Sequence, residues 1–368
     1  MDDERYLRQA LALAERGVGW TSPNPMVGAV IVKDGRVIGE GWHVRCGELH
    51  AERHALAHCR EDPRGATMYV NLEPCCHQGR QPPCVDALIE AGIARVVLGA
   101  RDPNPSVAGQ GIARLRRGGI SVTEGCLAEE CRQINEAFFH YIQTKRPFLA
   151  MKYAMTQDGK TAAYTGVSRW ISGEESRSHV HALRNRYRGI LVGVGTVLAD
   201  DPMLNCRMEG GRDPIRILCD SKLRTPLTAR VVRTAREIPT ILATCCTEEA
   251  RQAPYREAGC TVIVTPPRDG SVDLSLLMQE LGQREIDSVL LEGGGTLNWS
   301  ALQQGLVQKV YTYIAPKLLG GAGANSPVEG QGFPRPDEAV HLRTRKVTML
   351  GEDLLIESEV CSDVYGTR

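Results

Sequence analysis

The sequence lacks an excess of charge of either sign, a long apolar run and a rich supply of aromatic residues. Its 368 residues include 44 lysines and arginines and 44 aspartates and glutamates, so the formal net charge is zero. This balance argues against a nucleic-acid-binding protein, because affinity for a phosphate backbone requires a basic surface. It still allows a local basic pocket for one small phosphorylated ligand. No stretch approaches the roughly 18 apolar residues of a membrane span.

The start of the chain, Met1-Asp2-Asp3-Glu4-Arg5, has neither the basic nor the apolar region of a signal peptide. We therefore expect a cytoplasmic protein. The thirteen cysteines show no repeating spacing, in a chain too large for a disulfide scaffold. Reduced thiols are the expectation, and the length predicts two or three domains.

The most informative stretch runs from His50 to Cys84. It contains His50-Ala51-Glu52, then Glu73-Pro74-Cys75, then Cys84. One imidazole and two thiolates form a three-ligand zinc set that leaves a fourth tetrahedral position open for water. Glu52 is not needed as a ligand, so it is free to move protons. Because a structural zinc site usually has four protein ligands, the pattern favours a catalytic zinc.

Other residues offer alternatives at this site. His50, His54 and His58 recur every four residues, a pattern that alone is more often packing or solvated helix surface. Cys76 and His77 could compete with the preceding cysteine as ligands. The combination of His-x-Glu with a Pro-Cys pair and a later cysteine outweighs these alternatives.

The first part of the chain alternates helices with apolar strands. Apolar residues at helical spacing open the fold, and a Lys33-Asp34-Gly35 turn joins two strands in a hairpin. Such alternation predicts an α/β layer sandwich with partly parallel strands. We expect helices at 4–16, 51–59, 85–91, 107–118 and 127–144, and strands at 26–32, 36–42, 66–72 and 94–100.

A domain boundary is expected where Lys145-Arg146-Pro147 stops the last of these helices. We predict a first domain at 1–146, a second at 147–361 and a loose tail at 362–368. In the second domain, Ser172-Gly173-Glu174-Glu175 has the pattern of a capping box that opens a helix running to about residue 188. An antiparallel finish is also expected, with strands near 148–154, 189–196, 215–219, 238–243, 260–264, 288–291, 308–315 and 342–360.

Two strand ends in the second domain carry glycines. They read Gly193-Val194-Gly195-Thr196 and Glu292-Gly293-Gly294-Gly295-Thr296. Glycines after a strand let backbone N–H groups approach a phosphate. Neither is a Gly-x-Gly-x-x-Gly fingerprint or a Walker loop, and a plain strand-to-helix turn explains each one equally well. Two in one domain favour a nucleotide site.

The zinc pattern resembles the nucleobase deaminases, whose signature is His-x-Glu followed by Pro-Cys-x-x-Cys. Here eight residues, and not two, separate Cys75 from Cys84. That departure is similar to one branch, the riboflavin-biosynthesis deaminases, whose bacterial members are fused to a reductase. The resemblance covers the whole chain and is carried by the loop Pro74-Cys75-Cys76-His77-Gln78-Gly79-Arg80-Gln81-Pro82-Pro83-Cys84.

This resemblance implies an α/β fold with an N-terminal cytidine-deaminase-like three-layer domain and a C-terminal dihydrofolate-reductase-like domain. It implies zinc-dependent hydrolytic deamination of 2,5-diamino-6-(5-phosphoribosylamino)pyrimidin-4-one. NADPH-dependent reduction of the ribosyl group to ribityl would follow, giving 5-amino-6-(5-phosphoribitylamino)uracil. One Zn²⁺ per chain, NADPH, a phosphorylated pyrimidine substrate and a homo-oligomer are implied. We expect neither a nucleic-acid nor a membrane partner.

The resemblance also implies roles for individual residues. Guanidinium groups such as Arg184 and Arg207 pair well with phosphate, although an arginine on a helix is otherwise a solvated residue and Asn-Pro sequences are ordinary turns. No residue is marked as the reductase proton donor. Substrate contacts are implied in the first domain at Asn24, His43, Arg80, Asp102 and Asn104. In the second domain they are implied at Ser168, Arg184, Leu204, Arg207 and Glu292. Cofactor contacts are implied at Ala154, Trp170, Thr196, Asp200, Ser221, Gly294, Gly295 and Thr296.

Two rival functions remain at this point. A tRNA or nucleoside deaminase with an accessory domain would use the same chemistry, but the balanced charge and the long loop between the cysteines argue against it. A zinc-stabilised ligand-binding protein without turnover is the rival from another class. The variant Glu52→Ala distinguishes an enzyme from it, because an enzyme should keep its zinc and lose ammonia release.

Overall fold

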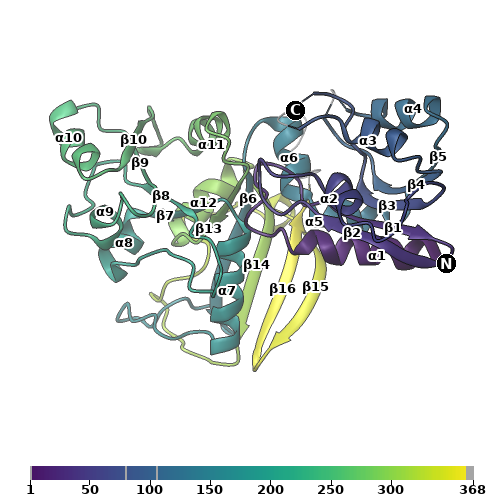
Figure 1. Cartoon of the computed structure of the whole chain (residues 1–368). Helices are drawn as coiled ribbons and strands as arrows, with labels where there is room; N and C mark the ends of the chain where they lie inside the picture. Colours follow the sequence, from purple (N-terminus) through teal and green to yellow (C-terminus); the bar gives the residue numbers. More distant parts are fainter. Residues whose placement is uncertain (1, 79–80, 105–106, 362–368) are drawn as a thin grey trace. The chain divides into compact units, whose positions relative to one another are not determined.

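The protein is described here by a computed structural model, which covers residues 2–78, 81–104 and 107–361. The chain forms two compact units, Met1–Lys145 and Arg146–Arg368, and most of their helices and strands are labelled in Figure 1. The limits 1–146 and 147–361 of the two functional domains stay a prediction. The expected tail at 362–368 lies outside the described residues. Within the described part, no helix is long and apolar enough to cross a membrane.

The first unit is built on a five-stranded sheet in the order β2-β1-β3-β4-β5. Strand β1 (Gly28–Lys33) pairs antiparallel with β2 (Arg36–Trp42) and with β3 (Thr67–Leu72). Strands β4 (Arg95–Ala100) and β5 (Ser121–Glu124) continue the sheet in parallel. The expected hairpin and the partly parallel sheet are therefore confirmed.

Helices cover both faces of this sheet. Side chains alternate across a strand, so Ile31 and Met68 face one core while Val30 and Tyr69 face the other. The first core is closed by α2 (Ala51–Ala57), α3 (Cys84–Glu90) and α4 (Gln110–Arg117). The second is closed by α1 (Asp2–Glu15), α5 (Ala128–Ile134) and α6 (Glu136–Thr144). This is the predicted three-layer arrangement.

One prediction for this unit is wrong, because the single helix expected at 127–144 is two helices that break at Asn135. The Asn135 side chain explains the break. Its Oδ1 accepts from the Met26 N–H at 2.8 Å, and its Nδ2 donates to the Met26 carbonyl at 2.9 Å. The amide thus ties the helix break to the backbone just before β1, and apolar periodicity cannot reveal such a contact. The four-residue strand β5 was not predicted.

The second unit is built on a nine-stranded sheet in the order β10-β9-β8-β7-β13-β6-β14-β16-β15. The first seven strands of this order, from β10 through β9, β8, β7, β13 and β6 to β14, run parallel. A hairpin of β15 and β16 adds the predicted antiparallel finish. A two-stranded ribbon, β11 (Pro267–Arg268) and β12 (Ser271–Val272), lies apart from it. The strands are β6 (Phe148–Thr156), β7 (Gly189–Gly193), β8 (Ile215–Cys219), β9 (Thr240–Thr244), β10 (Thr261–Val264), β13 (Ser288–Leu291), β14 (Val307–Ala315), β15 (Leu342–Leu350) and β16 (Asp353–Val360).

Helices cover this sheet as well, around two buried clusters of aliphatic side chains. One cluster includes residues of α11 and α12, and the other includes residues of α8, α9 and α10. The helices are α7 (Glu174–Arg186), α8 (Val194–Asp200), α9 (Arg230–Arg233), α10 (Glu249–Glu257), α11 (Leu274–Gln283) and α12 (Gly295–Gln303), with a 3-10 turn at Pro336–Glu338.

Three local predictions for this unit are wrong. The single strand expected at 342–360 is the antiparallel pair β15 and β16. Helix α7 has Gly173 as its N-cap with no side-chain cap, so Ser172 does not form a capping box. The carboxylate of Asp353 instead accepts the Gly173 N–H at 2.6 Å. The strand expected at 189–196 ends at Gly193, because α8 begins at Val194. The carboxyl ends of β6, β7, β8 and β13 lie along one edge of the sheet, where open parallel sheets bind their ligands.

Candidate metal centre and reductase cleft

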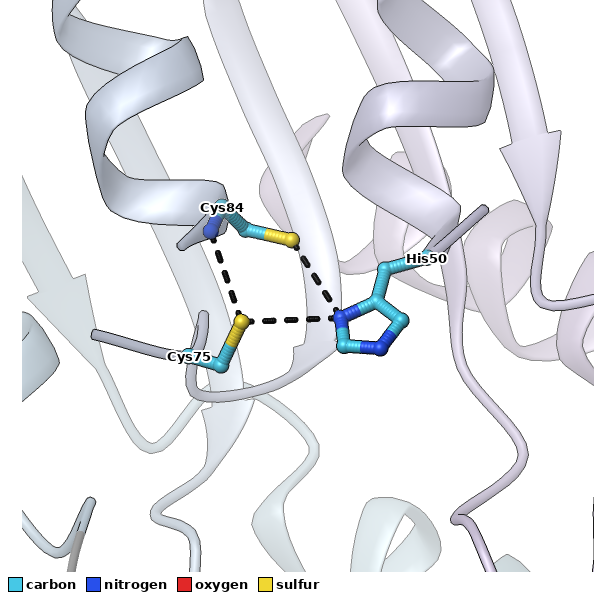
Figure 2. Close-up of side chains that lie close together, drawn as sticks. All are labelled: His50, Cys75 and Cys84. Carbon is cyan, nitrogen blue, oxygen red and sulfur yellow. Dashed lines mark hydrogen bonds between the residues drawn. The ribbon is translucent and has the colours of Figure 1, made fainter. Parts of the chain in front are cut away.

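The three predicted zinc ligands lie together in the first unit (Figure 2). His50 is the residue before α2, Cys75 follows β3, and Cys84 begins α3. The His50 Nδ1 atom is 3.5 Å from each Sγ, and the three ligand atoms are all within 4.8 Å of one another. Tetrahedral zinc with ordinary Zn–S and Zn–N bonds separates such atoms by about 3.6 Å. The residues therefore fit a zinc ion.

The surroundings favour negative charge on the Cys75 sulfur. The Cys84 backbone N–H, at the start of α3, points at the Cys75 sulfur at 3.4 Å, and helix N-termini favour thiolates. Hydrogen bonds from the Cys84 thiol and from His50 lower the pKa of Cys75 to about 4. The bond to Cys75 and burial raise the pKa of Cys84. The same Cys75 partner raises the pKa of His50.

Glu52 lies in the first turn of α2, two residues after the metal histidine. Its side chain is buried, with 4% of the residue exposed. Burial raises its pKa, and the charge on Cys75 raises it further, while His50 opposes the shift. A carboxyl group with a raised pKa can both accept and donate a proton near neutral pH.

Two predicted substrate contacts adjoin the metal group. His43 is buried, its ring centroid is 5.4 Å from that of His50, and its Nδ1 lies 3.0 Å from the Leu49 carbonyl. Nδ1 therefore carries the proton, and Nε2 accepts from Asn24 Nδ2 at 3.1 Å. Among the described residues no donor contacts the side-chain carbonyl oxygen of Asn24, so this oxygen can accept from a ligand.

A third contact, Asp102, is held by a residue that sequence reasoning missed. The buried Glu73 carboxylate accepts backbone N–H groups from Asp102 at 3.3 Å, Gly109 at 3.0 Å and Ile112 at 3.2 Å. Burial raises the pKa of Asp102 to about 6, against the N–H that Asn104 donates to its Oδ1 at 2.8 Å. Glu73 follows β3 directly, two residues before a metal ligand, which is the signal that could have revealed it.

The alternative ligands do not join the metal group in the described part of the chain. His54 Nδ1 accepts the Trp42 N–H at 3.1 Å, and His58 Nδ1 lies 2.8 Å from the His54 carbonyl. Cys76 packs against the core that α2 and α3 close, and His77 is exposed. The predicted contact Arg80 lies outside the described residues.

The second unit carries a cleft of about 1090 Å³ and, beside it, a smaller one of about 360 Å³. Both lie at the carboxyl edge of the sheet and share Ser168, Thr196 and the Gly294–Gly295 turn. The larger cleft is also lined by Asp200, Ser221 and Thr296, and the smaller by Ala154, Trp170, Arg184, Arg207 and Glu292. Both cavities have room for parts of a dinucleotide and its substrate.

A charged cluster forms one wall of the smaller cleft. Arg184 donates from Nε and Nη2 to the Glu292 carboxylate at 2.7 and 3.0 Å, and from Nη1 to the Asn205 carbonyl. Lys152 Nζ lies 3.7 Å from the same carboxylate. Burial opposes the charge of Glu292, but Arg184 and Lys152 outweigh it and lower the pKa of Glu292 to about 2. Burial lowers the pKa of Lys152.

These contacts change the expectation for phosphate binding. Three of the five N–H donors of Arg184 already bond within the protein, so at most two, one on each Nη, are left for a phosphate. Arg207 is exposed, lines the smaller cleft and donates from Nε to His181 Nε2 at 2.9 Å. Burial, then the nearby arginines, lower the pKa of His181 to about 4. Because the His181 imidazole is then neutral at pH 7, Arg207 is the cation of this pair that can bind a phosphate.

Two further residues complete the description of the cleft. Trp170 is 59% exposed, and the Arg177 guanidinium lies 4.5 Å from its ring centroid. Leu204 is buried in the core beside α8 and α9, so only its backbone could meet a substrate. Lys152 was not predicted, although a lysine inside the apolar run 148–154 was a signal for it.

Comparisons with known proteins identify the same two kinds of domain. A family model described as the cytidine and deoxycytidylate deaminase zinc-binding region matches residues 1–100, and one described as the RibD C-terminal domain matches residues 147–356. The riboflavin biosynthesis protein RibD of Actinobacillus pleuropneumoniae is 53% identical over 98% of this chain and 96% of its own length. That of Escherichia coli is 42% identical over 97% of this chain and 99% of its own.

A solved structure gives the same picture. The diaminohydroxyphosphoribosylaminopyrimidine deaminase/5-amino-6-(5-phosphoribosylamino)uracil reductase from Thermotoga maritima superposes with a TM-score of 0.86 at 38% identity. The match covers 98% of this chain and 99% of that one. The fold is therefore a cytidine-deaminase-like unit followed by a dihydrofolate-reductase-like unit. The chain belongs to the RibD family of bifunctional deaminase–reductases of riboflavin biosynthesis.

Proposed function

We propose that the first unit deaminates 2,5-diamino-6-(5-phosphoribosylamino)pyrimidin-4-one and that the second reduces its product to 5-amino-6-(5-phosphoribitylamino)uracil. The observation that carries the first step is the open three-ligand group with a buried carboxylate two residues from its histidine. The second step rests on the glycine-lined cleft and its charged wall.

In the deaminase site, His50, Cys75 and Cys84 would hold one zinc ion. When bound, zinc supplies an electrophile that acidifies the attacking water. Glu52 takes a proton from that water as its oxygen adds to the amine-bearing carbon, and returns it to the departing nitrogen as ammonia leaves. Burial of Glu52 supports this role, because a raised pKa suits both transfers. Asn24, His43, Asp102 and Asn104 would contact the ribotide.

In the reductase site, the Gly294–Thr296 turn and Thr196 would hold NADPH, with Ala154, Trp170, Asp200 and Ser221 as further contacts. NADPH supplies the hydride for C1 of the sugar. Glu292 stays ionised between its two cations, and this fixed pair would orient the sugar's polar groups. Ser168, Arg207 and the Leu204 backbone would complete the substrate site, with Arg207 on the phosphate.

The test incubates the full chain with the diamino ribotide, with and without NADPH, and resolves the products by mass. We expect the deaminated ribotide without NADPH and the ribityl product with it. Glu52→Ala should keep its zinc and lose ammonia release, whereas Glu48→Ala, an exposed residue outside the metal group, should keep both. Unchanged ammonia release from Glu52→Ala would remove Glu52 from the mechanism. Self-association and a cytoplasmic location stay predictions.

A further inference from the structure

Two cations line the larger reductase cleft without a partner. Lys222 and Arg224 are both exposed and both line it. Neither side chain has a hydrogen-bond or ion-pair partner among residues 2–78, 81–104 and 107–361. The third cation of the cleft differs, because the Arg169 guanidinium lies 3.6 Å from the Asp200 carboxylate. Two unpaired cations at one end of a ligand cleft indicate an anionic ligand group.

The loop that carries them is fixed in place. The buried Asp220 carboxylate accepts from the Thr225 N–H at 2.7 Å and from its hydroxyl at 2.8 Å. The Tyr255 hydroxyl donates to the Thr225 carbonyl, and Arg251 donates to the Lys222 carbonyl, both at 2.6 Å. Leu223, between the two cations, is buried with a left-handed φ of 47°. These hydrogen bonds and the buried Leu223 therefore fix the backbone of the loop, while the two charged side chains remain exposed.

The position of this loop in the sheet identifies the ligand group. Strands β13, β7 and β8 are neighbours, so the Gly294 turn, the Gly193 turn and the Ser221–Arg224 loop follow one another along the carboxyl edge. Adjacent strands are about 4.8 Å apart. A dinucleotide whose pyrophosphate lies at the N-terminus of α12 would extend its adenosine ribose over β7 towards β8.

The residues at the end of β8 distinguish the two nicotinamide cofactors. A non-phosphorylated cofactor is read by an acidic side chain that accepts its ribose 2′-hydroxyl, and a phosphorylated one by a nearby cation. The acidic residue at this strand end, Asp220, is turned to Thr225 and does not line the cleft. We propose that Lys222 and Arg224 bind the cofactor's 2′-phosphate and so select the phosphorylated dinucleotide, an inference that rests on the proposed reductase function.

The test is calorimetric titration of the full chain with two fragments that differ only in this group, adenosine 2′,5′-bisphosphate and adenosine 5′-monophosphate. We expect the bisphosphate to bind about tenfold more tightly or better, as one charge-assisted contact allows. Lys222→Gln/Arg224→Gln should remove most of that preference and change monophosphate affinity less than about twofold. A matched control, Arg230→Gln/Arg233→Gln, removes the same charge from the exposed side chains of α9, outside the cleft, and should keep the preference.

The outcomes separate the two levels of the proposal. Equal affinity of the unmodified chain for both fragments overturns the selection and leaves the nucleotide cleft standing. A preference that survives in Lys222→Gln/Arg224→Gln, or that disappears equally in the control variant, overturns the assignment to these two residues. Failure to bind either fragment overturns the proposed cofactor site itself, and the inference with it.

Discussion

The fully buried Arg216 of β8 gives the most direct test of what stabilises the second unit. No surface of this residue is exposed. Its guanidinium donates to the hydroxyls of Thr234 and Thr240 and to the carbonyls of Met203, Val231 and Ile238, at 2.7 to 3.3 Å. Burial lowers its pKa to about 10. It is thus a buried cation whose hydrogen-bond acceptors are all neutral.

Replacing it in Arg216→Met keeps most of the volume and removes every donor. Three carbonyls then lose this partner, at about 1 kcal/mol each, so we expect a loss of about 3 kcal/mol. For a unit of this size, a change of 1 kcal/mol moves the melting temperature by about 2–4 °C, which predicts a fall of roughly 6–12 °C. Scanning calorimetry should show this fall in the second unit's transition and none in the first.

The control is Arg233→Met, which removes an exposed arginine from α9 and should leave both transitions in place. An Arg216→Met protein that melts at the original temperature or above would refute the reasoning. It would mean that the desolvation of the guanidinium offsets its hydrogen bonds, as happens for some buried ion pairs.

Three further predictions follow from the two sites. Glu73→Gln should raise the deaminase KM several-fold with little change in zinc content, because the loop of Asp102 loses its anchor; an unchanged KM in steady-state assays would contradict this. The pKa of Glu292 is about 2 in the folded protein and 4.5 without its partners. Its ion pairs therefore contribute on the order of 3 kcal/mol to the free energy of unfolding. This contribution is fully present above about pH 4.5 and is lost as the pH falls towards 2. Acid unfolding of Glu292→Gln should lack this dependence, and an identical curve would count against it. Removing zinc with a chelator should abolish ammonia release from the diamino ribotide. NADPH oxidation, followed by absorbance with the deaminated ribotide supplied as substrate, should stay intact; its loss would show that the units are not independent.

The zinc group was predictable from sequence because its chemistry is local. His50 and Glu52 are two residues apart, and the cysteines follow a strand end and open a helix, so short-range spacing was enough to identify them. Glu73 was missed because its role is to accept backbone N–H groups, and no residue type marks that role in advance.

The charged cluster in the smaller cleft was less predictable, because its residues come from elements far apart in the sequence. Lys152 comes from β6, Arg184 from α7 and Glu292 from the end of β13, and only the strand order brings them together. The pairing of Arg184 with Glu292 also redirects a side chain that suits phosphate equally well. Family resemblance named Arg184 and Glu292 but not Lys152, and it could not say which donors were already occupied.

The central place of β6 has a consequence for how the chain is made. This strand is the first of its sheet to be synthesised, yet Phe148 pairs with Ser288 of β13, and Leu149 with Val307 of β14. It must therefore wait, with its edges open, until most of the second unit has left the ribosome. The residues up to Lys145 form a compact unit by themselves, so we expect this unit to fold first. Deaminase activity should therefore precede reductase activity during translation.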